Sequence, residues 1–312
     1  MMGAVRSSVA LRGELRTGEP LASYTTWRVG GPAERFYEPA DRADLAEFLA
    51  TLPADEPIFF LGHGSNLLVR DGGLRGTVIL TAGSLTRIER VADTCLMAEA
   101  GVACARLARF AARAGLGGIE FLAGIPGTFG GALAMNAGAH GAAIWDFVRD
   151  LEVIDRGGRM RQRTAADYEI GYRSVRSNDD AWFIAATLSL QPADPAACEQ
   201  RIRELLARRA ATQPIGKPSC GSVFRNPPGD HAGRLIEAAG LKGAREGGCQ
   251  VSTLHANFII NVGGATARDL ERLIQRVRDV VRERTGVDLQ PEVRIVGEPG
   301  VEAAAGAATN GH

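Results

Sequence analysis

The chain has 312 residues, which suits two or three modest domains with a sizeable core. Acidic and basic residues balance at 36 each, which excludes a global field that would attract nucleic acid or an acidic membrane surface. The five cysteines are odd in number and lack C-x-x-C spacing, so we expect neither a disulfide framework nor a metal site. With no signal peptide or apolar span in the sequence, we expect a cytoplasmic protein.

The first part of the chain predicts a lead-in over residues 1–20 and a small β-α-β-β unit over 21–82. The lead-in shows no clear period. Asp41 is placed to cap a helix over about 42–52, whose apolar residues recur at helical spacing. The expected strands cover residues 57–61, 67–70 and 77–80.

A second unit is predicted over residues 83–190. Two strands and a helix over about 103–114 precede a glycine-rich stretch. The turn Arg156-Gly-Gly-Arg159 between apolar runs at 148–155 and 160–163 is typical of a hairpin. A strand over 182–190 closes the unit, and residues 191–195 are the expected linker.

The third unit is predicted over residues 196–298. It begins with a helix to about residue 211, whose arginines we expect to form a solvated face. Thr266 is placed to cap a long helix to about Arg284. Strands are expected over 256–262 and 287–296, and a disordered tail over 299–312. The overall pattern predicts the α+β class.

The stretch from Gly118 to Gly141 contains seven glycines and almost no charge. Glycine is needed where the backbone adopts positive φ or where another group approaches the main chain closely. Successive N–H groups in such turns form concave anion sites suited to a diphosphate. The alternative is a buried glycine-rich turn without a ligand.

A second glycine cluster, Gly62-His-Gly-Ser-Asn66, follows a predicted buried strand. Its main-chain donors and the side chains of Ser65 and Asn66 are suited to phosphate oxygens. The cluster is not a Rossmann fingerprint, because no helical period follows it. Two such loops about sixty residues apart predict a large nucleotide-type ligand.

Three further positions carry chemistry. Arg173 follows Tyr172 in a turn and is able to pair with a carboxylate or an oxyanion, and the alternative, which the sequence alone favours, is a surface salt bridge. Ser222 follows a glycine between two prolines and is a candidate hydroxyl donor or an ordinary turn serine. Glu292 either pairs with an arginine (Arg294 or Arg173) or points into a cleft.

Taken together, these stretches resemble the UDP-N-acetylenolpyruvoylglucosamine reductases, flavoenzymes of bacterial peptidoglycan precursor synthesis. The matching motifs occur in family order from about residue 20 to residue 298. They are Thr26-Trp-Arg-Val-Gly-Gly31, Gly62-His-Gly-Ser-Asn-Leu-Leu68, Gly124-Ile-Pro-Gly-Thr-Phe-Gly-Gly131, Asn136-Ala-Gly-Ala-His-Gly141, Tyr172-Arg-Ser174, Gly221-Ser-Val-Phe-Arg-Asn-Pro227 and Pro291-Glu-Val-Arg294.

The resemblance implies an FAD-binding region of the vanillyl-alcohol-oxidase type, formed by the first two units, and a third unit that binds the sugar nucleotide. The implied FAD-binding residues are Gly62, His63, Gly64, Ser65, Asn66, Gly124, Ile125, Pro126, Gly127, Thr128, Gly130, Gly131, Asn136 and Gly138. The implied substrate contacts are Tyr172, Lys217, Arg225, Asn226 and His255. No room is found between Arg176 and Trp182 for the tyrosine-bearing loop of the longer family type, so the chain resembles the shorter type.

The implied reaction has two halves. NADPH reduces the flavin, and hydride then passes from N5 of FAD to C3 of the enolpyruvyl ether of UDP-N-acetylglucosamine. By resemblance, Arg173 and Glu292 stabilise the enolate-like charge and Ser222 protonates C2. We expect a monomer that binds neither nucleic acid nor a membrane.

Two other functions remain open from the sequence. One is an oxidase of the same flavin fold, in which His63 or His140 carries covalently attached flavin. The other is a nucleotide-binding regulator without catalysis, which leaves Arg173, Ser222 and Glu292 without a purpose.

Overall fold

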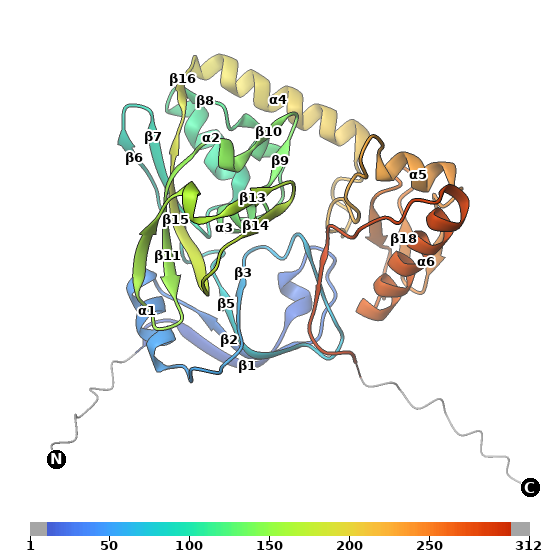
Figure 1. Cartoon of the computed structure of the whole chain (residues 1–312), viewed down its shortest axis with the longest axis horizontal. Helices are drawn as coiled ribbons and strands as arrows, with labels where there is room; N and C mark the ends of the chain where they lie inside the picture. The colour runs from blue at the N-terminus through green and yellow to red at the C-terminus, as the bar shows by residue number, and fades with distance from the viewer. Residues whose placement is uncertain (1–10, 301–312) are drawn as a thin grey trace, which may run out of the picture. The chain divides into compact units, whose positions relative to one another are not determined.

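The computed structural model describes residues 11–300 (Figure 1). These residues divide into two compact units, each made of several stretches of the chain. Unit 1 contains residues 11–16, 36–63 and 77–211. Unit 2 contains residues 17–35, 64–76 and 212–300. The domains predicted from the sequence follow one another along the chain, whereas these units alternate along it. Mixed helices and strands confirm the α+β class.

A five-stranded antiparallel sheet organises unit 1, with the strand order β12-β11-β15-β7-β6. The strands are β6 (Ile88–Ala92), β7 (Cys95–Glu99), β11 (Val148–Asp155), β12 (Met160–Arg163) and β15 (Ala181–Ser189). The predicted β11–β12 hairpin is confirmed: its turn contains Gly158 at φ 76°, and the Asp155 carboxylate accepts hydrogen bonds from the N–H groups of Gly157 and Arg159. In Figure 1, β11 and β15 run side by side in green and yellow.

Helix α2 (Cys104–Arg113) buries Leu107, Ala108 and Ala111 in the same core as Leu96 and Leu188 of the sheet. The other elements around this core are β8 (Leu116–Gly117), α3 (Phe129–Ala134), β9 (Gly138–Ala139), β10 (Ala142–Ala143), β13 (Glu169–Gly171), β14 (Ser174–Arg176), β16 (Gln191–Pro192) and α4 (Pro195–Thr212).

A second, four-stranded sheet has the order β1-β2-β5-β3. Its strands are β1 (Glu14–Pro20), β2 (Pro32–Glu38), β3 (Ile58–Leu61) and β5 (Leu74–Leu80). The expected helix is α1 (Arg42–Thr51), and Asp41 caps it by accepting a hydrogen bond from Asp44 N–H. Leu45, Phe48 and Leu49 of α1 are buried, in agreement with the helical spacing of the apolar residues in this segment.

The lead-in predicted over residues 1–20 is wrong from Glu14 onward, because Glu14–Pro20 form β1. This strand lies at the edge of its sheet, and the exposed side chains along it give no apolar alternation to read. Residues 1–10, and residues 301–312 of the predicted tail, lie outside the described part of the chain.

Unit 2 is built on helix α6 (Ala267–Thr285). Thr266 caps its start, as predicted, in a capping box with Asp269, and Gly286 caps its end in the left-handed conformation. Its buried face includes Leu270, Leu273 and Val277. The remaining elements are β4 (Leu67–Val69), α5 (Ala232–Ala238), β17 (Arg245–Glu246), β18 (Cys249–Val251), β19 (Ile259–Asn261) and β20 (Arg294–Val296).

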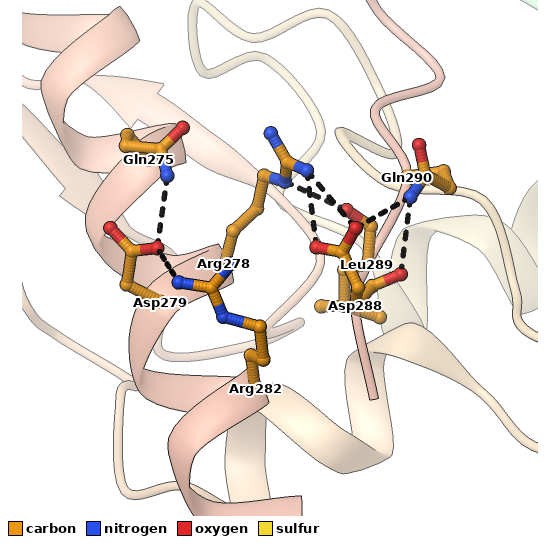
Figure 2. Close-up of polar contacts among 7 residues, drawn as sticks. All are labelled: Gln275, Arg278, Asp279, Arg282, Asp288, Leu289 and Gln290. Carbon is orange, nitrogen blue, oxygen red and sulfur yellow. Dashed lines mark hydrogen bonds and ion pairs between the residues drawn. The ribbon is translucent and has the colours of Figure 1, made fainter. Parts of the chain in front are cut away.

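The strand predicted over 287–296 is wrong for most of its length, because only Arg294–Val296 form β20, parallel to β4. The residues that precede β20 form hydrogen bonds with a side chain of α6 instead of with a strand. Arg278 donates from Nε to the Leu289 carbonyl at 2.9 Å and from Nη2 to the Asp288 carboxylate (Figure 2). Pro291 also lacks the N–H that a strand ladder needs. The segment that leads to Glu292 is therefore an irregular one anchored to a helix.

Candidate active site

The loop from Gly124 to Gly131 lies in unit 1, and most of its later N–H groups serve the fold. Phe129 N–H donates to Val102, Gly130 N–H donates to Ala100, and Gly131 N–H donates to the Thr128 hydroxyl that caps α3. Within residues 11–300, the structure gives no acceptor for the N–H groups of Gly127 and Thr128. Fewer main-chain N–H groups of this loop are thus available to bind an anion than the sequence predicted.

The glycines of the two loops have different reasons to be glycine. A Cβ at Gly62 would lie 2.3 Å from Thr128 Oγ1, and one at Gly130 would lie 2.7 Å from Ala100, so these positions are required by the packing of the chain against itself. At Gly124 and Gly131 the nearest atoms would lie at 3.7 and 3.5 Å, which is ordinary contact. The chain's own packing does not exclude a side chain at these two positions, which fits main chain kept bare for a ligand.

The contact between Gly62 and Thr128 brings the two predicted loops together within unit 1. The first loop, however, is divided by the unit boundary: Gly62 and His63 belong to unit 1, and Gly64, Ser65 and Asn66 belong to unit 2. In unit 2, Gly64 adopts φ 56° and its carbonyl accepts a hydrogen bond from Thr26 N–H.

One arginine that the sequence assigned to a solvated face lies beside the glycine loop. The Cδ atom of Arg209, near the end of α4, lies 3.7 Å from the Cβ position of Gly124. Burial lowers the pKa of the Arg209 guanidinium from its usual value. Nothing in the arginine-rich helix distinguishes this position from its neighbours, so sequence reasoning missed it.

Arg173 and the predicted Asn136–Gly138 segment come together in unit 1. Arg173 donates from Nη2 to the Gly138 carbonyl at 2.7 Å and from Nη1 to the Asn136 carbonyl at 3.4 Å. Asn136 in turn donates from Nδ2 to the Gly171 carbonyl. Both Asn136 and Arg173 have positive φ, at 42° and 52°, which is uncommon for residues with a Cβ. The half-exposed ring of Tyr172 lies 5.5 Å from the Arg173 guanidinium carbon.

Asn136 also carries an orphan acceptor. Its Oδ1 is buried and has no hydrogen-bond partner among the described residues. A buried acceptor of this kind costs about 1–3 kcal/mol unless something donates to it. A polar ligand group at this loop would relieve that cost.

Ser222 and Glu292 are brought to neighbouring backbone positions in unit 2. Glu292 N–H donates to the carbonyl of Val223, the residue after Ser222, at 2.8 Å. Asn66 of the first glycine loop donates from Nδ2 to the Glu292 carbonyl at 3.1 Å. Gly221 adopts φ 82°, a conformation that glycine reaches without strain, and this sets the direction in which the backbone enters Ser222.

Cys220, two residues before Ser222, is a buried thiol. Burial raises its pKa well above the usual value, and the negative charge of Glu292 adds to the shift. The thiol is therefore protonated near neutral pH, and we assign it no nucleophilic role.

The predicted substrate contacts of unit 2 lie around the start of α5 and in the loop before Ser222. Asn226 accepts a hydrogen bond from Ala232 N–H, and His255 lies against Gly233. Burial lowers the pKa of His255, whose ring packs edge-on against Phe258. Arg225 is half-buried and Lys217 is exposed.

The structure thus assembles two groups of predicted residues, one in each unit. Arg173 with Asn136, Gly138 and the glycine loop belongs to unit 1, and Ser222 with Glu292 belongs to unit 2. The convergence of Arg173 on Ser222 stays a prediction. Among residues 11–300, no helix has both the length and the apolar character needed to cross a membrane.

Two family models match the chain. One is described as "FAD binding domain" and matches residues 33–163, and the other as "UDP-N-acetylenolpyruvoylglucosamine reductase, C-terminal domain" and matches residues 213–296. The UDP-N-acetylenolpyruvoylglucosamine reductase of Alkalilimnicola ehrlichii is 62% identical, over 92% of this chain and 96% of its own length. The reductase of that name from Methylococcus capsulatus is 58% identical, over 95% and 97%.

A solved structure gives the same result. The crystal structure of the UDP-N-acetylenolpyruvylglucosamine reductase of Thermus caldophilus aligns with a TM-score of 0.78 and 35% sequence identity. The alignment covers 91% of this chain and 98% of the other.

Proposed function

Because this chain belongs to the UDP-N-acetylenolpyruvoylglucosamine reductase family, we propose that Ser222, Glu292 and Arg173 carry its proton transfer and charge stabilisation. The chain is an FAD-dependent oxidoreductase that uses NADPH and acts on a UDP-sugar in peptidoglycan synthesis. The substrate that we propose is UDP-N-acetyl-3-O-(1-carboxyvinyl)-glucosamine, and the product is UDP-N-acetylmuramate. The proposal includes a monomer in the cytoplasm.

The residues of unit 1 fit the flavin on three grounds. The main chain at Gly124 and Gly131 is bare without a packing reason, Asn136 Oδ1 lacks a donor within residues 11–300, and Arg209 brings a cation to the loop. When bound, FAD supplies the hydride that it has received from NADPH. We assign its diphosphate to the loop at Gly62 and Gly124–Gly131, where Gly127 and Thr128 have N–H groups to donate.

The remaining chemistry belongs to side chains. Hydride addition at C3 of the enolpyruvyl group leaves negative charge on C2 and the carboxylate. Arg173, as a cation, and Glu292, as a hydrogen-bonding acid when its carboxyl is protonated, would stabilise that charge, and the Ser222 hydroxyl would give its proton to C2. The observation that supports this assignment is the hydrogen bond from Glu292 N–H to the carbonyl of Val223, the residue that follows Ser222.

Absorbance of the holoenzyme tests the function. NADPH added without oxygen should bleach the flavin band, and the enolpyruvyl sugar nucleotide should restore it in a single turnover. If oxygen restores the flavin band faster than the enolpyruvyl sugar nucleotide does, the result would instead support an oxidase. Flavin that stays with acid-precipitated protein would likewise support an oxidase, with flavin on His63 or His140.

Arg209→Ala should weaken FAD binding without loss of the fold. Removing one charge-assisted contact costs about 1.5–3 kcal/mol, so we expect the Kd of FAD to rise at least tenfold. The measurement is a fluorescence titration of flavin-free protein. Arg203→Ala is the matched control, because Arg203 lies exposed on the same helix and bonds to Gln200. Equal Kd values for the two variants would remove Arg209 from the site.

A further inference from the structure

Asn257 is a buried asparagine that grips the segment after Ser222. Asn257 is only 3% exposed to solvent. Its Oδ1 accepts from Phe224 N–H at 3.0 Å, and its Nδ2 donates to the Phe224 carbonyl at 2.8 Å. Its own carbonyl accepts from Val223 N–H at 2.9 Å. Asn257 thus makes three hydrogen bonds to the two residues that follow Ser222.

The same segment is bonded on another side to the residues around Glu292. Glu292 N–H donates to the Val223 carbonyl at 2.8 Å, and Arg225 N–H donates to the Gln290 carbonyl at 2.9 Å. Phe224 and Pro291 form an isolated bridge rather than part of a named strand. Because Pro291 has no N–H, this pairing cannot extend as a regular ladder. The Asn257 amide therefore adds the support that a neighbouring strand would otherwise give.

A primary amide of this length satisfies both groups of Phe224 at any pH, because it always has a donor and an acceptor. One side chain must accept from the N–H and donate to the carbonyl of the same residue. Leucine has a similar size but leaves both main-chain groups unsatisfied. Aspartate retains the acceptor, and it can donate only when it is protonated.

We propose that Asn257 is a positioning residue, whose amide holds Ser222 and Glu292 in register so that hydroxyl and carboxyl face one substrate. This inference rests on the proposed function. Asn257 also connects to a proposed substrate contact, because its N–H donates to His255 Nδ1 at 3.3 Å. One turn thus supports both the reacting pair and a binding residue.

The test compares the two half-reactions in holoenzyme that carries Asn257→Leu. Reduction of the flavin by NADPH should stay within about twofold of wild type. Reoxidation by the enolpyruvyl sugar nucleotide should slow by about ten- to a hundredfold, since displacements of about 1 Å have effects of this size. A purely structural role would slow both half-reactions or lower flavin content.

Asn257→Asp adds a pH signature that a structural defect would not produce. Burial raises the pKa of a carboxyl, so the new side chain is protonated, and able to donate, at the low end of the accessible range. As pH rises through that pKa, the ionised carboxylate faces the Phe224 carbonyl and repels it. The reoxidation rate relative to wild type should therefore fall with rising pH, and the Asn257→Leu ratio should not.

Asn261→Leu is the matched control in the same unit. Asn261 also bridges main-chain groups, donating to the Trp27 carbonyl at 3.0 Å and accepting from Gly263 N–H at 2.9 Å. It should lower thermal stability and leave the ratio of the two half-reactions unchanged.

Ser222→Ala separates failure of this inference from failure of the proposed function. A loss of reoxidation with Ser222→Ala but not with folded Asn257→Leu overturns the positioning role alone. No loss with Ser222→Ala overturns the proposed function and the inference that rests on it. Should Asn257→Leu fail to fold, the pH ratio of Asn257→Asp decides, and a flat ratio overturns the inference.

Discussion

Ser222→Ala should reduce its flavin with NADPH at close to the wild-type rate and then fail to reoxidise it at a useful rate. General acid catalysis contributes about 10²–10⁴-fold, and no other hydroxyl is assigned to C2, so we expect reoxidation to slow by that factor. Rapid-mixing absorbance measures the two steps separately. Charge stabilisation by Arg173 and Glu292 is untouched, so binding of the sugar nucleotide should change little.

Ser219→Ala provides the control for this experiment. Ser219 is half-buried in the same loop, and its replacement removes a hydroxyl of the same kind. Its half-reactions should match wild type. If the reoxidation rate of Ser222→Ala falls by less than tenfold, or if it falls equally in both variants, Ser222 is not the proton donor.

Trp27→Ala should destabilise unit 2 by about 3–5 kcal/mol, the usual cost of truncating a buried aromatic residue. Trp27 is fully buried in the core formed by α5 and α6, and its indole N–H donates to the Ile259 carbonyl at 2.7 Å. The large effect follows from these long-range contacts, although the residue lies near the N-terminus. Denaturant unfolding followed by circular dichroism measures the free energy of unfolding.

Trp27→Phe separates the two contributions to this loss. The ring volume is largely kept while the Ile259 carbonyl loses its donor, so a smaller cost of about 1–3 kcal/mol is expected. Trp182 stacks on another aromatic ring at a half-buried position in unit 1, so Trp182→Phe should lower the free energy of unfolding by less than Trp27→Phe. A change below about 1 kcal/mol in Trp27→Ala would contradict the assignment of this segment to the core of unit 2.

Elements with local signals were predictable from the sequence. The helix from Thr266 carries its own cap and apolar period, and the β11–β12 hairpin carries its own turn residues, so neither depends on distant partners. The β1 strand was not predictable, because its polar residues are ordered by neighbours in the sheet. The segment before β20 was misread because Arg278, on another element, holds it.

The candidate site divides in the same way. Motif order identified Ser222 and Glu292, and the structure supplies the Val223 contact that joins them. Asn257 and Arg209 gave no usable signal: one is a polar residue in an expected apolar strand, and the other is one arginine among several. Their roles arise from contacts with the Phe224 main chain and the Gly124 loop, which lie far away in the sequence.

The alternation of the two units along the chain has a consequence during translation. Trp27 emerges from the ribosome 232 residues before Ile259, the residue whose carbonyl it binds. At about 5–20 residues per second, this tryptophan waits roughly 10–50 s for its partner. During that interval a large aromatic surface is open to chaperones or to neighbouring nascent chains, so the yield of active enzyme should depend on how quickly synthesis reaches the C-terminal third.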